Sequence, residues 1–166
     1  MKVVGLIAEY NPFHNGHQHH IDEAKKQTGA DYVIVVMSGN FVQRGAPAII
    51  HKYSRSKVAL ESGADIVFEL PVIYSTASAE TFALGAVSLL DKLGVVDFLC
   101  FGSESGDIKA LTSIAKYLYE YSDEYNQDIN RYIKEGISFP LARSKAIKKN
   151  NPEINEEIIS SPNNIL

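Results

Sequence analysis

Residues 2–21 read KVVGLIAEYNPFHNGHQHHI, an apolar run followed at once by a polar turn that places four histidines within seven positions. The run Lys2–Ala8 is rich in Val, Leu and Ile, which predicts a buried strand. Behind it, Asn15 or Gly16 can open a helix that runs to about Gln27, because two lysines fall in its last turn and a glycine follows. The stretch therefore predicts a strand, a tight turn and a helix, and leaves open what the histidines do.

Three roles compete for His14, His17, His19 and His20. A structural zinc site draws four ligands, and no cysteine or convergent pair of acids lies nearby in sequence. A solvated turn suits His19 but does not explain Gly16. A phosphate-binding turn explains more, because nucleotides bind where the first strand of a parallel sheet ends and a helix N-terminus attracts anions. Gly16 then permits close backbone approach, and neutral imidazoles can donate hydrogen bonds to phosphate oxygens.

The alternation of strand and helix continues along the chain. Further strands are expected at 32–37, 65–70 and 95–101, and further helices at 51–62 and 76–93. The strands are almost continuously apolar, which is typical of a parallel sheet covered on both faces. From residue 107, apolar and aromatic residues recur every three or four positions, which predicts one long helix to about residue 132.

The expected fold class is thus α/β, a Rossmann-like parallel sheet with helices on both faces, plus C-terminal helices. We expect one domain of 166 residues, with the Rossmann-like core at about 1–105 and a helical segment at about 106–150. The sequence closes on SSPNNIL, without a charged tail or a helix end, so we expect that it has been cut before a further helical part.

The amino-acid composition excludes several classes of protein. A content of 45% hydrophobic and 22% charged residues is that of an ordinary globular protein, and a net charge of −4 gives no global field that attracts nucleic acid. The single cysteine, Cys100, excludes an internal disulfide framework and suits a reducing compartment. No apolar stretch is long enough for a signal peptide or a membrane span. We expect a cytoplasmic protein without membrane contact, and no protein partner is inferred.

Two groups of motifs carry a resemblance to known families. His14-Asn15-Gly16-His17 resembles the H-x-G-H signature of the nucleotidylyl transferase superfamily, whose members attack the α-phosphate of a nucleotide. GLIAEYNPFHNGHQHHI, MSGNFVQRGAPAIIHKYSR, GADIVFELP, FGSE, FPLAR and SSPNNIL together resemble the tRNA-Met cytidine acetate ligase family over essentially the whole chain. At 159–166, Pro and Asn stand where the superfamily often has a Thr and a basic residue.

The resemblance implies an ATP-dependent ligase. It forms acetyl-adenylate from acetate and ATP, with Mg2+ held mainly by the phosphates, and acetylates the wobble cytidine of elongator tRNA-Met. The implied catalytic residues are His14 and His17, and no residue is assigned to a metal. The implied nucleotide-binding residues are Ile7, Ala8, Glu9, Tyr10, Asn11, Pro12, Phe13, His14, Asn15, Gly16, His17, His20, Gly102, Asn163 and Asn164, with Ser160 and Ser161 as weaker candidates.

Other polar residues fit either a site or a solvated surface. Candidates to contact acetate, phosphate or RNA are Asn40, Gln43, Arg44, Lys52 and Arg55. Candidates to contact the RNA backbone are Arg143, Lys145, Lys148 and Lys149, in a segment without acids. Asp65 and Glu69 share one strand face, and Glu69 lies nearer the site.

Two further functions stay open from the sequence. A cofactor-type nucleotidyltransferase, which adenylylates a phosphate-bearing small molecule, would share the motif and the fold. A tRNA-binding module that keeps the fold without the chemistry is the third possibility.

Overall fold

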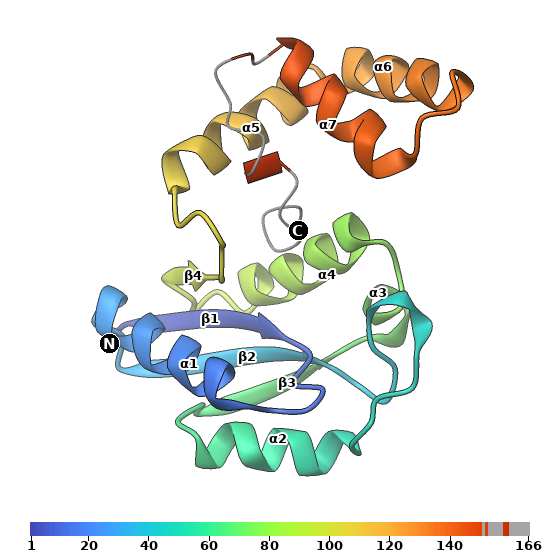
Figure 1. The fold of residues 1–166 in the computed structure, drawn as a ribbon. Helices are drawn as coiled ribbons and strands as arrows, with labels where there is room; N and C mark the ends of the chain where they lie inside the picture. Colours follow the sequence, from blue (N-terminus) through green and yellow to red (C-terminus); the bar gives the residue numbers. More distant parts are fainter. Residues whose placement is uncertain (151, 153–157, 160–166) are drawn as a thin grey trace. The chain divides into compact units, whose positions relative to one another are not determined.

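The computed structural model describes residues 1–150, 152 and 158–159. The chain divides into two compact units, Met1–Phe101 and Gly102–Leu166. Figure 1 draws both in one ribbon, and each is described here by itself. The division falls a few residues before the change of sequence pattern at residue 107.

The first unit is the expected parallel α/β sheet. Its strands are β1 (Val3–Ala8), β2 (Tyr32–Ser38), β3 (Ile66–Leu70) and β4 (Phe98–Cys100), all paired in parallel in the order β3-β2-β1-β4. Its helices are α1 (Asn15–Thr28), the 3-10 turn η1 (Gln43–Gly45), α2 (Lys52–Glu61), α3 (Val72–Ser75) and α4 (Ala79–Lys92). The fold class predicted from the sequence is confirmed, although β4 is shorter than expected and the helix expected at 76–93 begins only at residue 79.

Helices cover both faces of this sheet because the side chains of each buried strand alternate between two cores. Val4, Leu6, Val33 and Val35 pack with α1 and α2 on one face. On the other face, residues such as Ile34 pack with the apolar side of α4. Figure 1 shows the same arrangement, with α1 and α2 on one side of the strands and α4 on the other. The carboxyl ends of β1 and β2, neighbours in this layer, therefore present their loops at one edge.

Aspartates fix the opposite, amino edge of the sheet. The Asp65 carboxylate accepts the N–H of Val33 at 2.8 Å, and Asp97 accepts that of Val3 at 2.8 Å. Asp65 also lies 3.8 Å from the ammonium of Lys25. Asp65 therefore serves strand alignment, away from the edge where Glu69 lies.

The second unit holds α5 (Ile108–Glu120), α6 (Ser122–Lys134) and α7 (Phe139–Asn150). The single long helix expected from residue 107 is wrong, because the chain breaks at Tyr121 (φ −119°, ψ 33°). The continuous apolar stripe serves two separate clusters, one around Ile114 and one around Ile129, and each packs against α7. Acidic residues in the first turn of α6 favour a new helix N-terminus there.

Within the part of the chain that the structure describes, no helix has the length and apolarity that a membrane crossing requires.

Candidate nucleotide-binding site

The turn between β1 and α1 is built around a histidine cap. His14 is the N-cap of α1, and its Nδ1 accepts the N–H of Gly16 at 3.1 Å. Three residues on, the Nδ1 of His17 accepts the N–H of His14 at 3.3 Å. The two imidazoles thus replace the Ser/Thr and Glu/Gln side chains of an ordinary capping box.

This cap fixes the tautomer of both rings. A neutral imidazole that accepts a hydrogen bond at Nδ1 carries its proton on Nε2. The rings of His14 and His17 stack with centroids 3.8 Å apart and an interplanar angle of 22°. Two Nε2–H donors are therefore paired at the N-terminus of a 14-residue helix, where the helix dipole also favours an anion.

Burial keeps His17 uncharged. The pKa of His17 is lowered to about 4, first because the half-buried ring is desolvated and second because His14 and His20 lie close. The pKa of His20 is also lowered, by burial and then by His19. His20 Nε2 is buried and has no hydrogen-bond partner among the described residues. Near pH 7 His17 is thus a neutral donor rather than a cation.

The aromatic rings of Tyr10 and Phe13 pack against each other next to the histidine cap. Tyr10 is 1% exposed, and its ring meets those of Phe13 and His17 edge-on at centroid distances of 4.8 and 4.9 Å. Burial raises the pKa of the Tyr10 hydroxyl. Tyr10 adopts φ 49°, the left-handed region that a bulky side chain rarely occupies. The backbone therefore turns sharply after β1, and His14 comes to lie at the N-terminus of α1.

Gly16 has a local reason to be glycine. A Cβ placed there would lie 3.0 Å from Cε1 and 3.1 Å from Nδ1 of the His14 ring. The sequence explanation, that Gly16 lets backbone approach a phosphate, stays a prediction. The contact with His14 adds a second reason, because a side chain at this position would disturb the cap itself.

The loop after β2 is tied to this turn by hydrogen bonds. The Glu9 carboxylate accepts the N–H of Gln43 at 2.6 Å, and Asn11 Oδ1 accepts the N–H of Ile49 at 2.7 Å. Arg55, read from sequence as a site or surface charge, is instead buried and donates to three backbone carbonyls. Sequence gives no signal for this role, because the carbonyls of Glu9 and Gly39 lie 46 and 16 residues away from Arg55 in sequence.

The other polar residues predicted to contact substrate differ in their exposure and in their partners. Asn40 is exposed, and the side chain of Arg44 lies outside the described part. Lys52 pairs with Glu69 at 2.6 Å, which raises the pKa of Lys52. Two carboxylates, on Glu69 and Glu9, are thus already engaged with donors of this unit.

The remaining predicted nucleotide contacts lie in the second unit. Gly102 is exposed, and apart from its own atoms and its chain neighbours no atom of the described residues lies within 4 Å of where its Cβ would be. Ser160, Ser161, Asn163 and Asn164 fall outside the described residues, so their roles stay predictions. In residues 1–150, 152 and 158–159, no three His, Cys, Asp or Glu side chains come together as a metal site would require.

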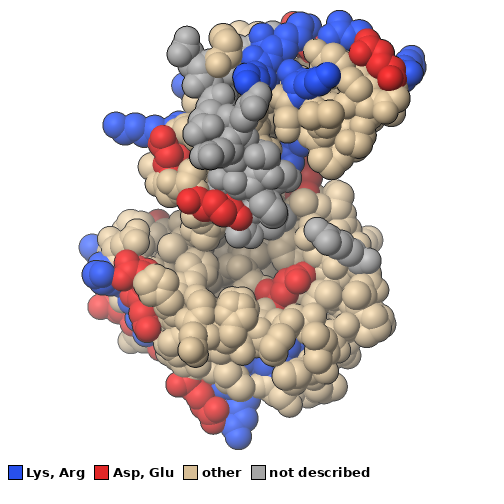
Figure 2. Space-filling model, in the orientation of Figure 1, with Lys and Arg blue, Asp and Glu red and all other residues tan. Residues whose placement is uncertain are grey.

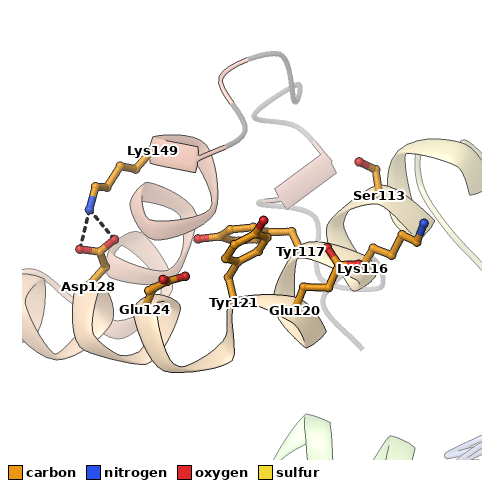
Figure 3. A pocket seen from close by; sticks show the side chains of 8 residues that line it. All are labelled: Ser113, Lys116, Tyr117, Glu120, Tyr121, Glu124, Asp128 and Lys149. Carbon is orange, nitrogen blue, oxygen red and sulfur yellow. Dashed lines mark hydrogen bonds and ion pairs between the residues drawn. The ribbon is translucent and has the colours of Figure 1, made fainter.

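A hollow of about 630 Å3 lies in the helical unit (Figure 3). On its wall Lys149 binds both oxygens of Asp128, at 2.9 and 2.8 Å, and Arg131 reaches the same carboxylate at 3.1 Å. The sequence reading of Lys149 as part of an acid-free basic segment missed Asp128, which is 21 residues away in sequence. One of the four candidate RNA contacts is therefore paired with a buried acid.

A parallel sheet in the order β3-β2-β1-β4, with two histidine side chains that accept backbone hydrogen bonds at the N-terminus of the first helix, defines an α/β domain of the nucleotidyltransferase type. The chain belongs to the HIGH nucleotidyl transferase family, whose model matches residues 1–166.

Named relatives and solved structures agree with this family. The tRNA(Met) cytidine acetate ligase of Acetivibrio thermocellus is 55% identical over 168 residues, covering 100% of this chain and 40% of the relative. The protein of the same name from Thermoanaerobacter sp. is 53% identical, covering 100% of this chain and 42% of the relative. The crystal structure of Thermotoga maritima TmcAL bound with alpha-thio ATP is 48% identical, with a TM-score of 0.89 over 99% of this chain and 41% of that one. The chain thus spans about two fifths of the length of these relatives.

Proposed function

We propose that this chain is the nucleotide-binding, adenylate-forming part of a ligase that acetylates the wobble cytidine of elongator tRNA-Met. The observation that carries the proposal is the histidine cap, in which both Nδ1 atoms accept backbone N–H groups and two Nε2–H donors are stacked at a helix N-terminus. The whole-chain similarity to relatives named tRNA(Met) cytidine acetate ligase supports the choice of acid and acceptor. ATP as the nucleotide is supported by the related TmcAL structure with its bound ATP analogue.

The proposed first step is an in-line displacement at the α-phosphate. A carboxylate oxygen of acetate bonds to phosphorus, the bond to the bridging oxygen breaks, and pyrophosphate leaves. His14 and His17 donate to the phosphate oxygens on which charge develops, and the N-terminal amides of α1 add to the same field. The step needs positioning and charge stabilisation rather than a base.

The proposed second step transfers the acetyl group. The exocyclic amine of the cytidine attacks the acyl carbon, AMP leaves, and the amine loses a proton. Mg2+ would accompany ATP and be held mainly by its phosphates, because Glu9 and Glu69 are already engaged by a backbone N–H and a lysine. The metal would neutralise charge on the triphosphate when bound.

We propose that the tRNA contacts include the exposed face of α7. Figure 2 shows lysine and arginine side chains gathered on the surface of the helical unit. Lys145 and Lys148 are exposed on this helix, and the Lys145 ammonium lies 5.8 Å from the centroid of the Tyr132 ring. Cations beside an aromatic face suit a single strand, whose phosphates pair with the cations and whose bases stack. Lys149 is left out because Asp128 binds it.

Pyrophosphate exchange into ATP with a panel of carboxylates tests the proposal. Acetate-dependent exchange is expected, and AMP release should follow when elongator tRNA-Met is added. A stable adenylylated phosphoester instead would favour a cofactor-type nucleotidyltransferase. ATP binding without exchange, both in this chain and in one of the length of its relatives, would favour a binding module.

A further inference from the structure

Arg55 is a charged residue in the interior of the first unit. It lies on α2, is 1% exposed, and is the largest fully buried side chain among the described residues. Its Nε donates to the carbonyl of Ile50 at 2.9 Å, and its two terminal nitrogens donate to the carbonyls of Glu9 and Gly39. All three acceptors are backbone carbonyls: one directly follows β1, and the other two lie at the two ends of the loop between β2 and α2.

Burying the charge of a guanidinium is unfavourable unless its hydrogen bonds compensate for the loss of water. Burial lowers the pKa of Arg55, and the negative charges of Glu9 and Glu69 only partly oppose this. A guanidinium stays protonated in a protein, so its charge remains buried. The planar fork fixes three acceptor directions at once, which the single ammonium of a lysine does not.

The three carbonyls lie where the site is assembled. Glu9 follows β1 and precedes Tyr10, whose left-handed backbone turns the chain toward the histidine cap. Gly39 follows β2, and Ile50 lies just before α2. A Cβ at Gly39 would come within 2.1 Å of a Glu69 oxygen, so this backbone is closely packed. Arg55 therefore joins the nucleotide turn to both ends of the loop after β2.

We propose that Arg55 is a positioning residue for adenylate formation, and this rests on the proposed function. It holds the Glu9 carbonyl against the loop at residues 39–50, so that the histidine cap and the loop keep one geometry during the displacement. In-line attack is sensitive to such geometry, since a displacement of about 1 Å in the reacting groups costs about 100-fold in rate. Arg55 touches no substrate in this role.

The test compares Arg55→Lys with Lys57→Ala, a change at an exposed charge on the same helix. In Arg55→Lys, kcat for acetate-dependent pyrophosphate exchange should fall about 100-fold, while KM for ATP changes less than about threefold because the cap remains. Lys57→Ala should leave both unchanged. A lower melting temperature in Arg55→Lys with wild-type kcat would reduce Arg55 to a stabilising role and overturn the proposal.

A second measurement uses the unaltered chain, so it stands even if Arg55→Lys does not fold. In 15N-arginine spectra, the Nε–H of Arg55 should exchange slowly, and its signal should shift when ATP is added. An unshifted signal with ATP bound overturns the proposal. Absence of acetate-dependent exchange in the wild type counts against the proposed function instead, and the ATP-dependent shift then still decides whether Arg55 is linked to the nucleotide turn.

Discussion

Replacing Gly16 by Ala tests the histidine cap directly. The new Cβ would lie 3.0 Å from His14 Cε1, about 0.4 Å less than the 3.4 Å at which ordinary contacts begin. The His14 ring must therefore move, and the 3.1 Å bond from Gly16 N–H to its Nδ1 weakens. Because the ring then loses its fixed orientation, its Nε2–H should no longer point reliably at the phosphate that we propose it binds.

In Gly16→Ala we expect a small effect on stability and a large effect on activity. Loss of an N-cap costs about 1 kcal/mol, while Ala is favoured over Gly in a helix by up to about 1 kcal/mol. The free energy of unfolding should therefore change by less than about 1 kcal/mol in Gly16→Ala. Loss of one oriented donor to transition-state charge lowers the rate about 100-fold.

Two assays check this pair of outcomes. Urea unfolding gives the stability, and acetate-dependent pyrophosphate exchange gives the rate. His19→Ala is the matched control, because His19 is an exposed histidine on the same helix outside the cap. In 15N-histidine spectra without ATP, the His14 nitrogens should shift in Gly16→Ala. Unchanged His14 signals together with lost activity would refute the reasoning, since Gly16 would then matter only for phosphate approach.

Three further outcomes are expected. His14→Ala and His17→Ala should each lower adenylate formation about 100-fold or more, with stability reduced by only about 1 kcal/mol; unchanged exchange rates in both would contradict the phosphate role. Because the pKa of His17 falls from 6.5 to about 4 on folding, only the unfolded chain binds a proton there between these values, so stability should decline as pH drops from 6.5 to 4. Urea unfolding across this range should show a smaller decline in His17→Gln, and an equal decline would exclude His17 as the cause. Lys145→Ala with Lys148→Ala should weaken tRNA binding and reduce the salt slope by about one to two, whereas Lys57→Ala should not; equal binding in all three chains would place the RNA elsewhere.

The sheet could be predicted because its signals are local. Runs such as residues 33–37 are apolar on both faces, and glycines and prolines mark their ends. The positions of the strands, and their assignment to a buried parallel sheet, can therefore be predicted without knowledge of distant contacts. The break at Tyr121 could not be predicted in the same way. The apolar spacing continues across it, and only the separate packing of Ile114 and Ile129 requires two helices.

The position of the candidate site can be predicted from the sequence, but the hydrogen-bond partners of its side chains cannot. The motif places His14 and His17 at a helix start, yet the spacing alone does not indicate that each Nδ1 accepts a backbone N–H. From the sequence alone, Arg55 and Lys149 are expected to be charges open to solvent or substrate. Their partners are carbonyls and a carboxylate 5 to 46 residues away in sequence, which only the tertiary fold brings close.

The use of both Nδ1 atoms as acceptors has a consequence for which nucleophiles the site can serve. With Nδ1 engaged and Nε2 protonated, neither His14 nor His17 has a lone pair left to take a proton. In the proposed first step, neither of these two histidines can therefore deprotonate the acid, which has to reach the α-phosphate already as an anion. Carboxylic acids, with pKa values of about 4, are anions at neutral pH, whereas alcohols are not. In the proposed adenylate-forming step, the backbone hydrogen bonds of this one helix cap would thus favour nucleophiles that are already anionic at neutral pH, whatever their size.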